Sequence, residues 1–220
     1  MTSLKSHIEH SLLKSDADKD AILQLCKEAM EAELWGVCVP PYHVKSAKQY
    51  FKEHKAKQKI STVIGFPMGY HAVSAKVEEI KKAAQDGADE MDIVMNIAAL
   101  KSGDMAVLRN DIHSTVTACH LQSKKAKIII ETSALTEAEK ESACALCVEA
   151  SADFVKTSTG FHSEGAQLED IRLMRRILPK QIKIKASGGI KEADFAKALL
   201  EAGAERLGTS SGLKLIQDEA

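Results

Sequence analysis

The sequence predicts a single α/β domain over residues 1–220, a (β/α)8 barrel in which eight parallel strands alternate with eight helices. Short runs of β-branched residues recur, separated by amphipathic stretches, as in a parallel sheet covered by helices. A weak repeat supports this order, because related tripeptides at 87–89, 151–153 and 203–205 each separate a helix from a strand. If each interval holds two strand–helix units, the chain accommodates eight. Alternation alone also fits a doubly wound open sheet, which is the second interpretation.

The expected strands are short and rich in valine and isoleucine. Such runs indicate strands that are buried on both faces, as in a barrel covered by helices. The first and last strands have weaker patterns and complete the set of eight. In chain order, the expected strands cover residues 8–13, 36–39, 61–66, 91–95, 127–131, 154–157, 182–185 and 206–208.

The stretches between these strands carry apolar stripes at helical spacing. Thr136 and Glu139 form the signature of a capping box, which opens a helix. Gly87 and Gly203 stand where a helix closes on a left-handed residue. The clearest stripes are Val77, Ile80 and Ala84; Leu108, Ile112, Val116 and Cys119; and Phe195, Leu199 and Ala202.

Composition and charge exclude several classes of protein. With 45% apolar and 28% charged residues, the chain is typical of a globular domain. Its formal charge of −1 argues against nucleic acid as a partner, and the basic stretch at 45–59 is expected to be a solvated helix and loop. No apolar run approaches the ~20 residues of a membrane helix, and the first residues lack the apolar core of a signal peptide. We expect a soluble, cytoplasmic protein with no membrane partner, and leave a homo-oligomer open.

Five cysteines are spread through apolar segments, which favours reduced, buried thiols. Cys144 and Cys147 form a Cys-x-x-Cys pair on one face of an expected helix. No second cysteine or histidine pair lies at the spacing of a zinc site. We therefore expect neither a metal site nor a redox disulfide at this pair.

Three charged residues stand inside expected strands, where burial is costly unless the charge has a partner or a task. They are Asp92, Lys156 and Lys185. Side chains of a barrel strand alternate between the lumen and the helices, so outward-facing Val155 and Ile184 would turn both lysines into the lumen. Both lysines lie late in their strands, toward the carboxyl-terminal end where barrel active sites form.

Two lumenal lysines and an aspartate suit Schiff-base chemistry. A lysine attacks a carbonyl only as the neutral amine, and a second cation nearby, together with burial, favours that form. The resulting iminium withdraws electrons and stabilises the enamine formed by carbon–carbon cleavage, while a carboxylate with a poised lysine can move protons. The alternative is a structural ion pair, which accounts for one lysine better than for two.

Three glycine-rich turns each follow a strand and precede a helix, at 157–160, 187–189 and 208–212. Glycine lets backbone N–H groups approach an anion, and the N-terminus of the following helix favours negative charge. The loops after strands 7 and 8 of a barrel commonly hold a phosphate. Together, the turns favour a phosphorylated substrate.

Several motifs resemble the deoxyribose-phosphate aldolase family. The resemblance extends from about residue 8 to residue 215 and is carried by Val-Ile-Gly-Phe-Pro-Met-Gly at 63–69, Gly-Ala-Asp-Glu-Met-Asp at 87–92, Phe-Val-Lys-Thr-Ser-Thr-Gly-Phe at 154–161, Ile-Lys-Ala-Ser-Gly-Gly-Ile at 184–190 and Gly-Thr-Ser-Ser at 208–211. It implies a (β/α)8 class I aldolase that needs no metal or other cofactor. Its phosphosugar substrate would be 2-deoxy-D-ribose 5-phosphate, cleaved reversibly to D-glyceraldehyde 3-phosphate and acetaldehyde.

The same resemblance implies roles for individual residues. Lys156 would form the Schiff base, Lys185 would be the neighbouring cation that favours the neutral amine and aids proton transfer, and Asp92 would be the acid–base partner. Cys38 and Thr159 would lie beside the substrate. The residues that would hold the phosphate are Gly160, Gly188, Gly189, Gly208, Ser210 and Ser211.

The chain departs from the family pattern at several positions near the expected substrate. Glu9 and Ser11 replace an aspartate and a threonine, and Pro40 replaces an asparagine. Gln167 replaces a threonine, and the sequence ends in alanine where some members of the family end in tyrosine. Two alternative functions stay open: another lysine-dependent barrel aldolase with a different donor, and a phosphosugar-binding barrel without catalysis.

Overall fold

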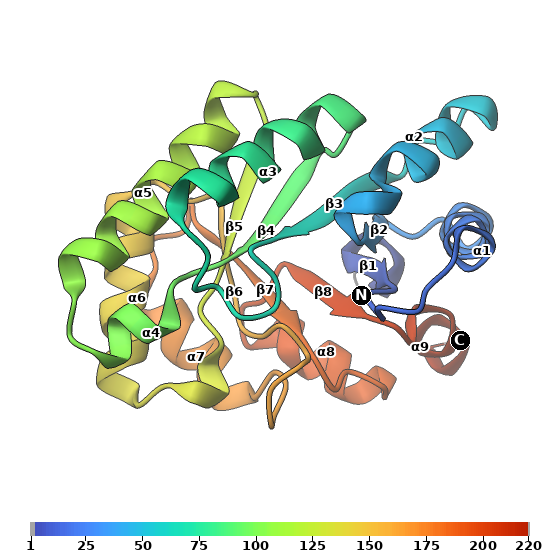
Figure 1. The fold of residues 1–220 in the computed structure, drawn as a ribbon. Coiled ribbons are helices and arrows are strands. Elements are labelled where there is room, and N and C mark those ends of the chain that lie inside the picture. Colours follow the sequence, from blue (N-terminus) through green and yellow to red (C-terminus); the bar gives the residue numbers. More distant parts are fainter. Residues whose placement is uncertain (1–2, 220) are drawn as a thin grey trace.

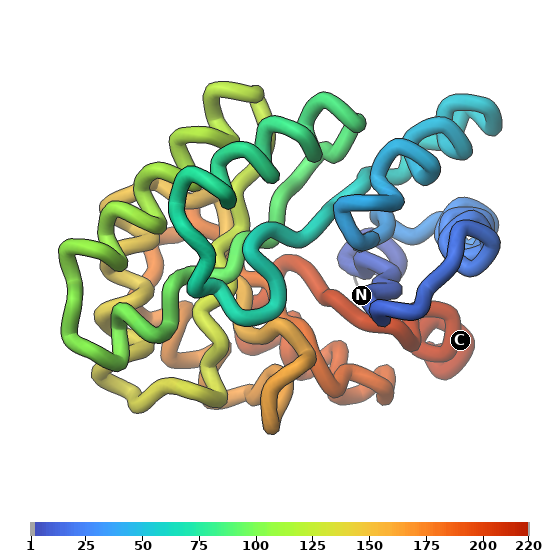
Figure 2. The backbone as a smooth tube through the Cα atoms, in the orientation of Figure 1, coloured from blue at the N-terminus to red at the C-terminus, as the bar shows by residue number. Residues whose placement is uncertain are grey.

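The structure, a computed structural model, describes residues 3–219 and shows a closed barrel of eight parallel strands with helices around it (Figure 1). Each strand pairs with the next along the chain, and β1 (Ile8–Ser11) closes the ring against β8 (Arg206–Thr209). The predicted barrel is therefore confirmed, and the doubly wound open sheet is wrong. Figure 2 follows the chain once around the ring, which brings its first and last elements side by side.

The strands agree with the predicted ones in order and number, with small shifts at their ends. β3 and β5 begin two residues earlier than expected, at the exposed Lys59 and Lys125, because backbone pairing with the neighbouring strand extends beyond the apolar run. β1 ends two residues earlier than expected, and β7 ends two residues later. The remaining strands are β2 (Gly36–Val39), β3 (Lys59–Ile64), β4 (Glu90–Val94), β5 (Lys125–Ile129), β6 (Phe154–Lys156) and β7 (Lys183–Ser187).

Helices follow the strands and cover the outside of the barrel (Figure 1). The predicted capping box at Thr136 and Glu139 is present, and Gly87 closes its helix in the left-handed conformation, as expected. The α-helices are α1 (Lys19–Glu31), α2 (Val44–Glu53), α3 (Val73–Asp86), α4 (Ile97–Lys101), α5 (Met105–Leu121), α6 (Glu137–Glu149), α7 (Leu168–Ile177), α8 (Ala193–Glu201) and α9 (Gly212–Glu219). In the described part of the chain, the 3-10 helices are η1 (Leu4–His7), η2 (Pro41–His43) and η3 (Thr132–Ala134).

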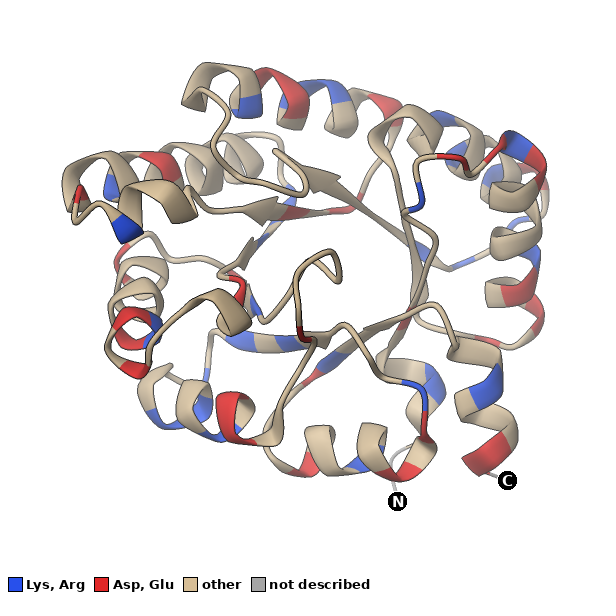
Figure 3. Ribbon diagram, turned by 60° about the horizontal axis from the view of Figure 1, so that its bottom comes forward, with Lys and Arg blue, Asp and Glu red and all other residues tan. Residues whose placement is uncertain are grey.

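The two faces of the sheet differ in chemistry. The outer face packs against the helices in an apolar core that contains Val155 and Ile184. The residues next to them, Lys156 and Lys185, point inward and pair with Asp92, so the predicted alternation is confirmed. Figure 3 looks into the barrel and shows charged segments on the strands as well as on the surrounding helices.

Several surface and core predictions are also confirmed. All five cysteines are free and buried, and burial raises the pKa of Cys26, Cys119 and Cys144 to about 12. The lysines of the basic stretch at 45–59 are exposed. Within residues 3–219, no helix is both long and apolar enough to cross a membrane.

Candidate active site

Seven charged side chains from six strands fill the barrel lumen and form one connected set of ion pairs. The set holds four cations and three carboxylates, all buried. Because an uncompensated buried charge is costly, the excess of one cation favours the neutral form of one lysine. We call the set the lumenal network; its members are Glu9, Glu90, Asp92, Lys127, Lys156, Lys185 and Arg206.

Asp92 on β4 is the centre of the lumenal network. Its Oδ2 atom accepts hydrogen bonds from Lys156 Nζ at 2.8 Å and Lys185 Nζ at 2.7 Å, so the two amines share one oxygen. Its Oδ1 atom accepts from Lys127 Nζ at 2.8 Å. Burial alone would raise the pKa of Asp92, but the three lysines outweigh it and hold the pKa well below its usual range. Asp92 is therefore an anion that fixes the position of both predicted catalytic lysines.

Lys185 stays a cation in this arrangement. Burial alone would lower the pKa of Lys185, but Asp92 and Glu9 outweigh it and raise the pKa. Burial would likewise raise the pKa of Glu9, yet Lys127 and Lys185 lower it from 4.5 to about 2. A cation on Lys185, held beside Asp92 and close to Lys156, is the electrostatic setting that the sequence predicted for a neutral amine at Lys156.

The three lysines of the lumenal network are not equivalent. Lys127 contacts three carboxylates, Lys185 contacts two and Lys156 contacts one. Burial would lower the pKa of Lys127, but its carboxylate partners raise it. The carboxylates thus stabilise the cation most at Lys127 and least at Lys156.

Sequence reasoning missed Lys127, Glu90 and Arg206. Lys127 lies between Ala126 and Ile128 in a strand, the same signal that pointed to Lys185. Its position near the start of the apolar run made it resemble a strand end, where a lysine can reach water. In the closed barrel it is fully buried, because β4 and β6 enclose β5 on both sides.

Aromatic side chains seal the amino-terminal end of the lumen beneath the lumenal network. The Arg206 guanidinium carbon lies 3.3 Å from the centroid of the Trp35 ring and 5.2 Å from the centroid of the Phe154 ring. Lys127 Nζ is 5.9 Å from both ring centroids. Arginine stacks well on aromatic rings, and beside these rings Lys127 is fully buried and Arg206 is 7% exposed, so little water reaches this end of the lumen. The prediction that Trp35 packs in the structure is confirmed.

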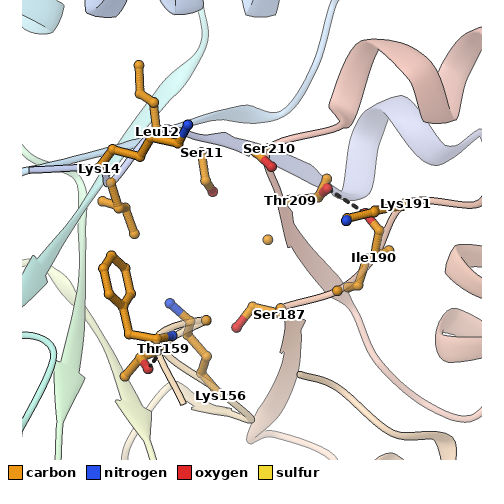
Figure 4. Close-up of a pocket in the computed structure, with 16 residues that line it drawn as sticks. Ser11, Leu12, Lys14, Lys156, Thr159, Ser187, Ile190, Lys191, Thr209 and Ser210 are labelled. Carbon is orange, nitrogen blue, oxygen red and sulfur yellow. Dashed lines mark hydrogen bonds between the residues drawn. The ribbon is translucent and has the colours of Figure 1, made fainter. Parts of the chain in front are cut away.

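The opposite, carboxyl-terminal end of the lumen opens into a pocket of about 290 Å³. Figure 4 shows Lys156, Ser187 and Ser11 directed toward the same open space. The pocket also contains Ser11, one of the predicted departures from the family pattern near the substrate, and Lys14 and Lys191, which the sequence had not singled out. The sequence-predicted residues that line the pocket are Lys156, Thr159, Gly160, Gly188, Gly189, Gly208 and Ser210.

Four predicted site residues do not line this pocket. Asp92 and Lys185 are fully buried next to Lys156, which lines the pocket, and the Asp92 carboxylate accepts hydrogen bonds from both lysines. Ser211 is half-buried, and its N–H donates to Thr209 Oγ1 at 2.9 Å. Cys38 is 1% exposed on β2, and burial raises the pKa of its thiol to about 11. Cys38 and Ser211 are therefore outside the lining of this pocket, and their places beside the substrate and at the phosphate stay predictions.

Cys38, Glu9 and Asp92 place one ligand atom each within 4.8 Å of one another, a possible cation site. Both carboxylates already bind lysines, and the thiol with its raised pKa is protonated. A metal ion requires the thiolate and would have to displace those lysines. These donors fit a metal poorly.

Two glycines of the pocket are required by close contacts. A Cβ atom on Gly208 would lie 3.0 Å from Lys185 Cε, so the absence of a side chain makes room for the lysine. Gly188 has a φ of +87°, and its backbone lies against Gly165, where a Cβ would meet Gly188 O at 2.1 Å. Within residues 3–219, the N–H groups of Gly160, Gly188 and Gly189 donate to no other group, which leaves them available to an anion.

Comparisons with known proteins agree with this geometry. Residues 7–218 match the family described as DeoC/LacD family aldolase. A protein of Thermococcus gammatolerans named deoxyribose-phosphate aldolase is 49% identical over 214 residues, which cover 97% of this chain and 95% of that protein. A protein of Shouchella clausii with the same name is 47% identical, over 98% of this chain and 95% of its own. The solved structure of a putative deoxyribose-phosphate aldolase from Coccidioides immitis superposes with a TM-score of 0.94 at 37% identity, covering 98% of this chain and 85% of that one.

Proposed function

The chain belongs to the DeoC/LacD family of aldolases, and on this premise we propose how its lumenal network acts on the substrate. The chain is a class I aldolase that reversibly cleaves 2-deoxy-D-ribose 5-phosphate to D-glyceraldehyde 3-phosphate and acetaldehyde through a lysine Schiff base. The family resemblance and the function that it implied are thus confirmed. The roles of individual residues are our proposal, and the position of Lys156 between Asp92 and the open pocket carries it.

Lys156 is the proposed nucleophile. Of the three lumenal lysines, it alone lines the pocket, and it has the fewest carboxylate partners. The excess cation of the lumenal network is therefore removed at least cost when Lys156 gives up its proton. The neutral amine attacks carbon 1 of the open-chain substrate, and loss of water from the resulting carbinolamine gives the iminium.

Cleavage of the bond between carbons 2 and 3 follows. A base removes the proton of the 3-hydroxyl, carbon 3 becomes the aldehyde of glyceraldehyde 3-phosphate, and the bonding electrons move to the iminium and form an enamine. Protonation of the enamine at carbon 2 and addition of water then release acetaldehyde and restore the amine. We assign these proton transfers to Asp92 and Lys185, which share a hydrogen bond next to Lys156.

The phosphate is proposed to bind at the rim of the pocket. The N–H groups of Gly160, Gly188 and Gly189 are available there, and Ser210 adds a hydroxyl. Lys14 and Lys191 line the same pocket and contribute positive charge. The partner is thus a small phosphosugar, and nucleic acid has no part in the proposed reaction.

Borohydride trapping with acetaldehyde tests the nucleophile. Reduction of the iminium fixes an ethyl group on the reacting lysine, and peptide mass mapping locates it. We expect the adduct on the peptide that contains Lys156 and none on peptides that contain Lys127 or Lys185. Lys183→Arg, a change at an exposed lysine near the sealed end of the barrel, is the control and should be labelled like the unmodified protein.

Other outcomes would contradict the proposal in distinguishable ways. An adduct on Lys185 would overturn the assignment of Lys156 while keeping the Schiff-base mechanism. No adduct on folded protein, together with trapping by a larger carbonyl donor, would favour an aldolase with a different donor. No adduct with any donor would favour a phosphosugar-binding barrel without catalysis.

A further inference from the structure

Glu131 is a buried carboxylate outside the lumenal network. It follows the end of β5, and only 2% of its surface is exposed. Its backbone adopts the left-handed conformation, with φ 57° and ψ 67°, which a residue other than glycine rarely adopts. A buried charge on a strained backbone persists only where its surroundings hold it in place, and such positions cluster at functional sites.

The partners of Glu131 lie in the turn that follows Lys156. The N–H of Thr159 donates to Glu131 Oε1 at 3.3 Å and to Oε2 at 3.2 Å. The hydroxyl of Thr159 also donates to Oε2. Hydrogen bonds to an ionised acceptor are the strong ones, so the carboxylate fixes both the backbone and the side chain of Thr159.

The Thr159 hydroxyl also holds the backbone two residues further along the chain. Besides donating to Glu131, it accepts the N–H of Phe161 at 3.1 Å. The N–H groups on both sides of Gly160 are thereby engaged, while that of Gly160 has no partner within residues 3–219. A Cβ atom on Gly160 would meet nothing within 4 Å, so this residue faces open space.

The base of the same turn is anchored separately. The N–H of Thr132 donates to Thr157 O at 2.9 Å, and Ser187 Oγ donates to Ser158 O at 2.6 Å. These bonds hold the stem next to Lys156 without the help of Glu131. The part of the turn that depends on Glu131 is thus the tip at 159–161, at the rim of the pocket and away from the lysine.

We propose that Glu131 is a positioning residue that, through Thr159, aims the Gly160 N–H at the phosphate of the substrate. This inference rests on the phosphate subsite proposed above. Glu131 therefore governs the recognition of phosphorylated over unphosphorylated acceptor aldehydes and has little effect on the chemistry at Lys156. The Thr159 hydroxyl serves this clamp and takes no chemical step.

The test compares two acceptors in the synthetic direction with acetaldehyde as donor, D-glyceraldehyde 3-phosphate and unphosphorylated D-glyceraldehyde. In Glu131→Gln we expect kcat/KM to fall about tenfold for the phosphorylated acceptor, mainly through KM, and to change little for the other. A merely structural role would lower both values together. Glu141→Gln, an exposed position on α6, is the matched control and should leave the ratio unchanged.

Changes at Thr159 keep the inference testable if Glu131→Gln folds poorly. Thr159→Val removes the hydroxyl at nearly constant shape and should reproduce the selective loss, whereas Thr159→Ser keeps the hydroxyl and should retain the preference. Because both residues act as one clamp, the double change Glu131→Gln with Thr159→Val should lose little more than either single change.

Three results would count against the inference. Equal losses for both acceptors, or fully additive losses in the double variant, would overturn the role of Glu131 and leave the phosphate subsite intact. An unmodified enzyme that does not prefer the phosphorylated acceptor would contradict the proposed phosphate subsite itself, and this inference with it.

Discussion

The two halves of the barrel lumen contain the same residue types, but the lysine in one half is structural and the lysine in the other is the proposed nucleophile. In the lower half, Lys127 is fully buried, contacts three carboxylates and lies above two aromatic rings. In the upper half, Lys156 contacts one carboxylate and opens into the pocket. Asp92 lies between them and binds both, one on each oxygen atom.

This difference indicates that a buried lysine becomes reactive when it has few carboxylate partners. A cation that is fully compensated stays charged and stabilises the fold, because removing its proton would leave its carboxylates unpaired. A cation with a single shared carboxylate, in a network that already has one cation too many, loses its proton at lower cost. Four predictions test whether the two halves are separate in function.

The largest expected effect is on activity in the upper half. Lys156→Met should lower kcat/KM for 2-deoxy-D-ribose 5-phosphate by about 10⁴-fold or more, because no other lumenal lysine reaches the pocket. The free energy of unfolding should change by less than about 2 kcal/mol, since Asp92, the carboxylate partner of Lys156, still pairs with Lys127 and Lys185. Steady-state kinetics and urea denaturation check the two values. A Lys156→Met variant that keeps wild-type turnover would contradict the division of the lumen into a catalytic upper half and a structural lower half.

The converse effect is expected in the lower half. Lys127→Met removes a partner from three buried carboxylates and should lower the free energy of unfolding by about 3–5 kcal/mol. Activity should fall less than in Lys156→Met, because Asp92 keeps both upper lysines. Chemical denaturation of the two variants under one set of conditions measures the contrast. Equal stability losses at the two positions would show that the halves are not distinct.

A pH dependence should follow from Glu9, whose folded-state pKa is lowered from 4.5 to about 2. A lowered pKa stabilises the fold above the unfolded-state value, and this contribution is lost as pH falls from about 4.5 to about 2. The shift corresponds to about 3 kcal/mol. Between pH 5 and pH 2, the free energy of unfolding of Glu9→Gln should therefore fall by about 3 kcal/mol less than that of the unmodified protein. Urea denaturation across this range measures it, and the exposed Glu169→Gln should behave like the unmodified protein.

The smallest expected effect concerns two adjacent serines at the rim. Ser210 lines the pocket and Ser211 does not, so Ser210→Ala should raise KM for the phosphosugar about fivefold, the value of one hydrogen bond. Ser211→Ala should change KM by less than about twofold. Steady-state measurements of KM in the two variants under the same conditions test this difference. A larger effect at Ser211 would mean that the pocket of the liganded enzyme extends past Ser210 to include Ser211.

The barrel and the positions of its inward-facing lysines could be predicted from the sequence, because both follow from local alternation. Val155 and Ile184 are apolar and outward, so Lys156 and Lys185 must point inward. Strand ends were less predictable. β5 starts at Lys125 because pairing with β4 continues past the apolar run, and a pattern of apolar residues does not report backbone pairing.

The candidate site was predictable only in part, for a similar reason. The motif at 154–160 marks Lys156, but nothing local distinguishes a lysine with three carboxylates from a lysine with one. The clamp between Glu131 and Thr159 joins residues 28 positions apart, and its strained backbone has no sequence signature. The place of Cys38 beside the substrate is implied by the resemblance alone; the structure shows the residue buried and outside the pocket lining.

By itself, the sequence determined the fold class, the family and the inward direction of the catalytic candidates, since these depend on residue type, period and motif. Only the tertiary structure decided how the charges are shared. The lumenal network joins seven side chains from six strands, and the number of carboxylates around each lysine depends on distances across the lumen. Those distances exist only after the ring of strands has closed, because β1 and β8 lie at opposite ends of the chain until they pair.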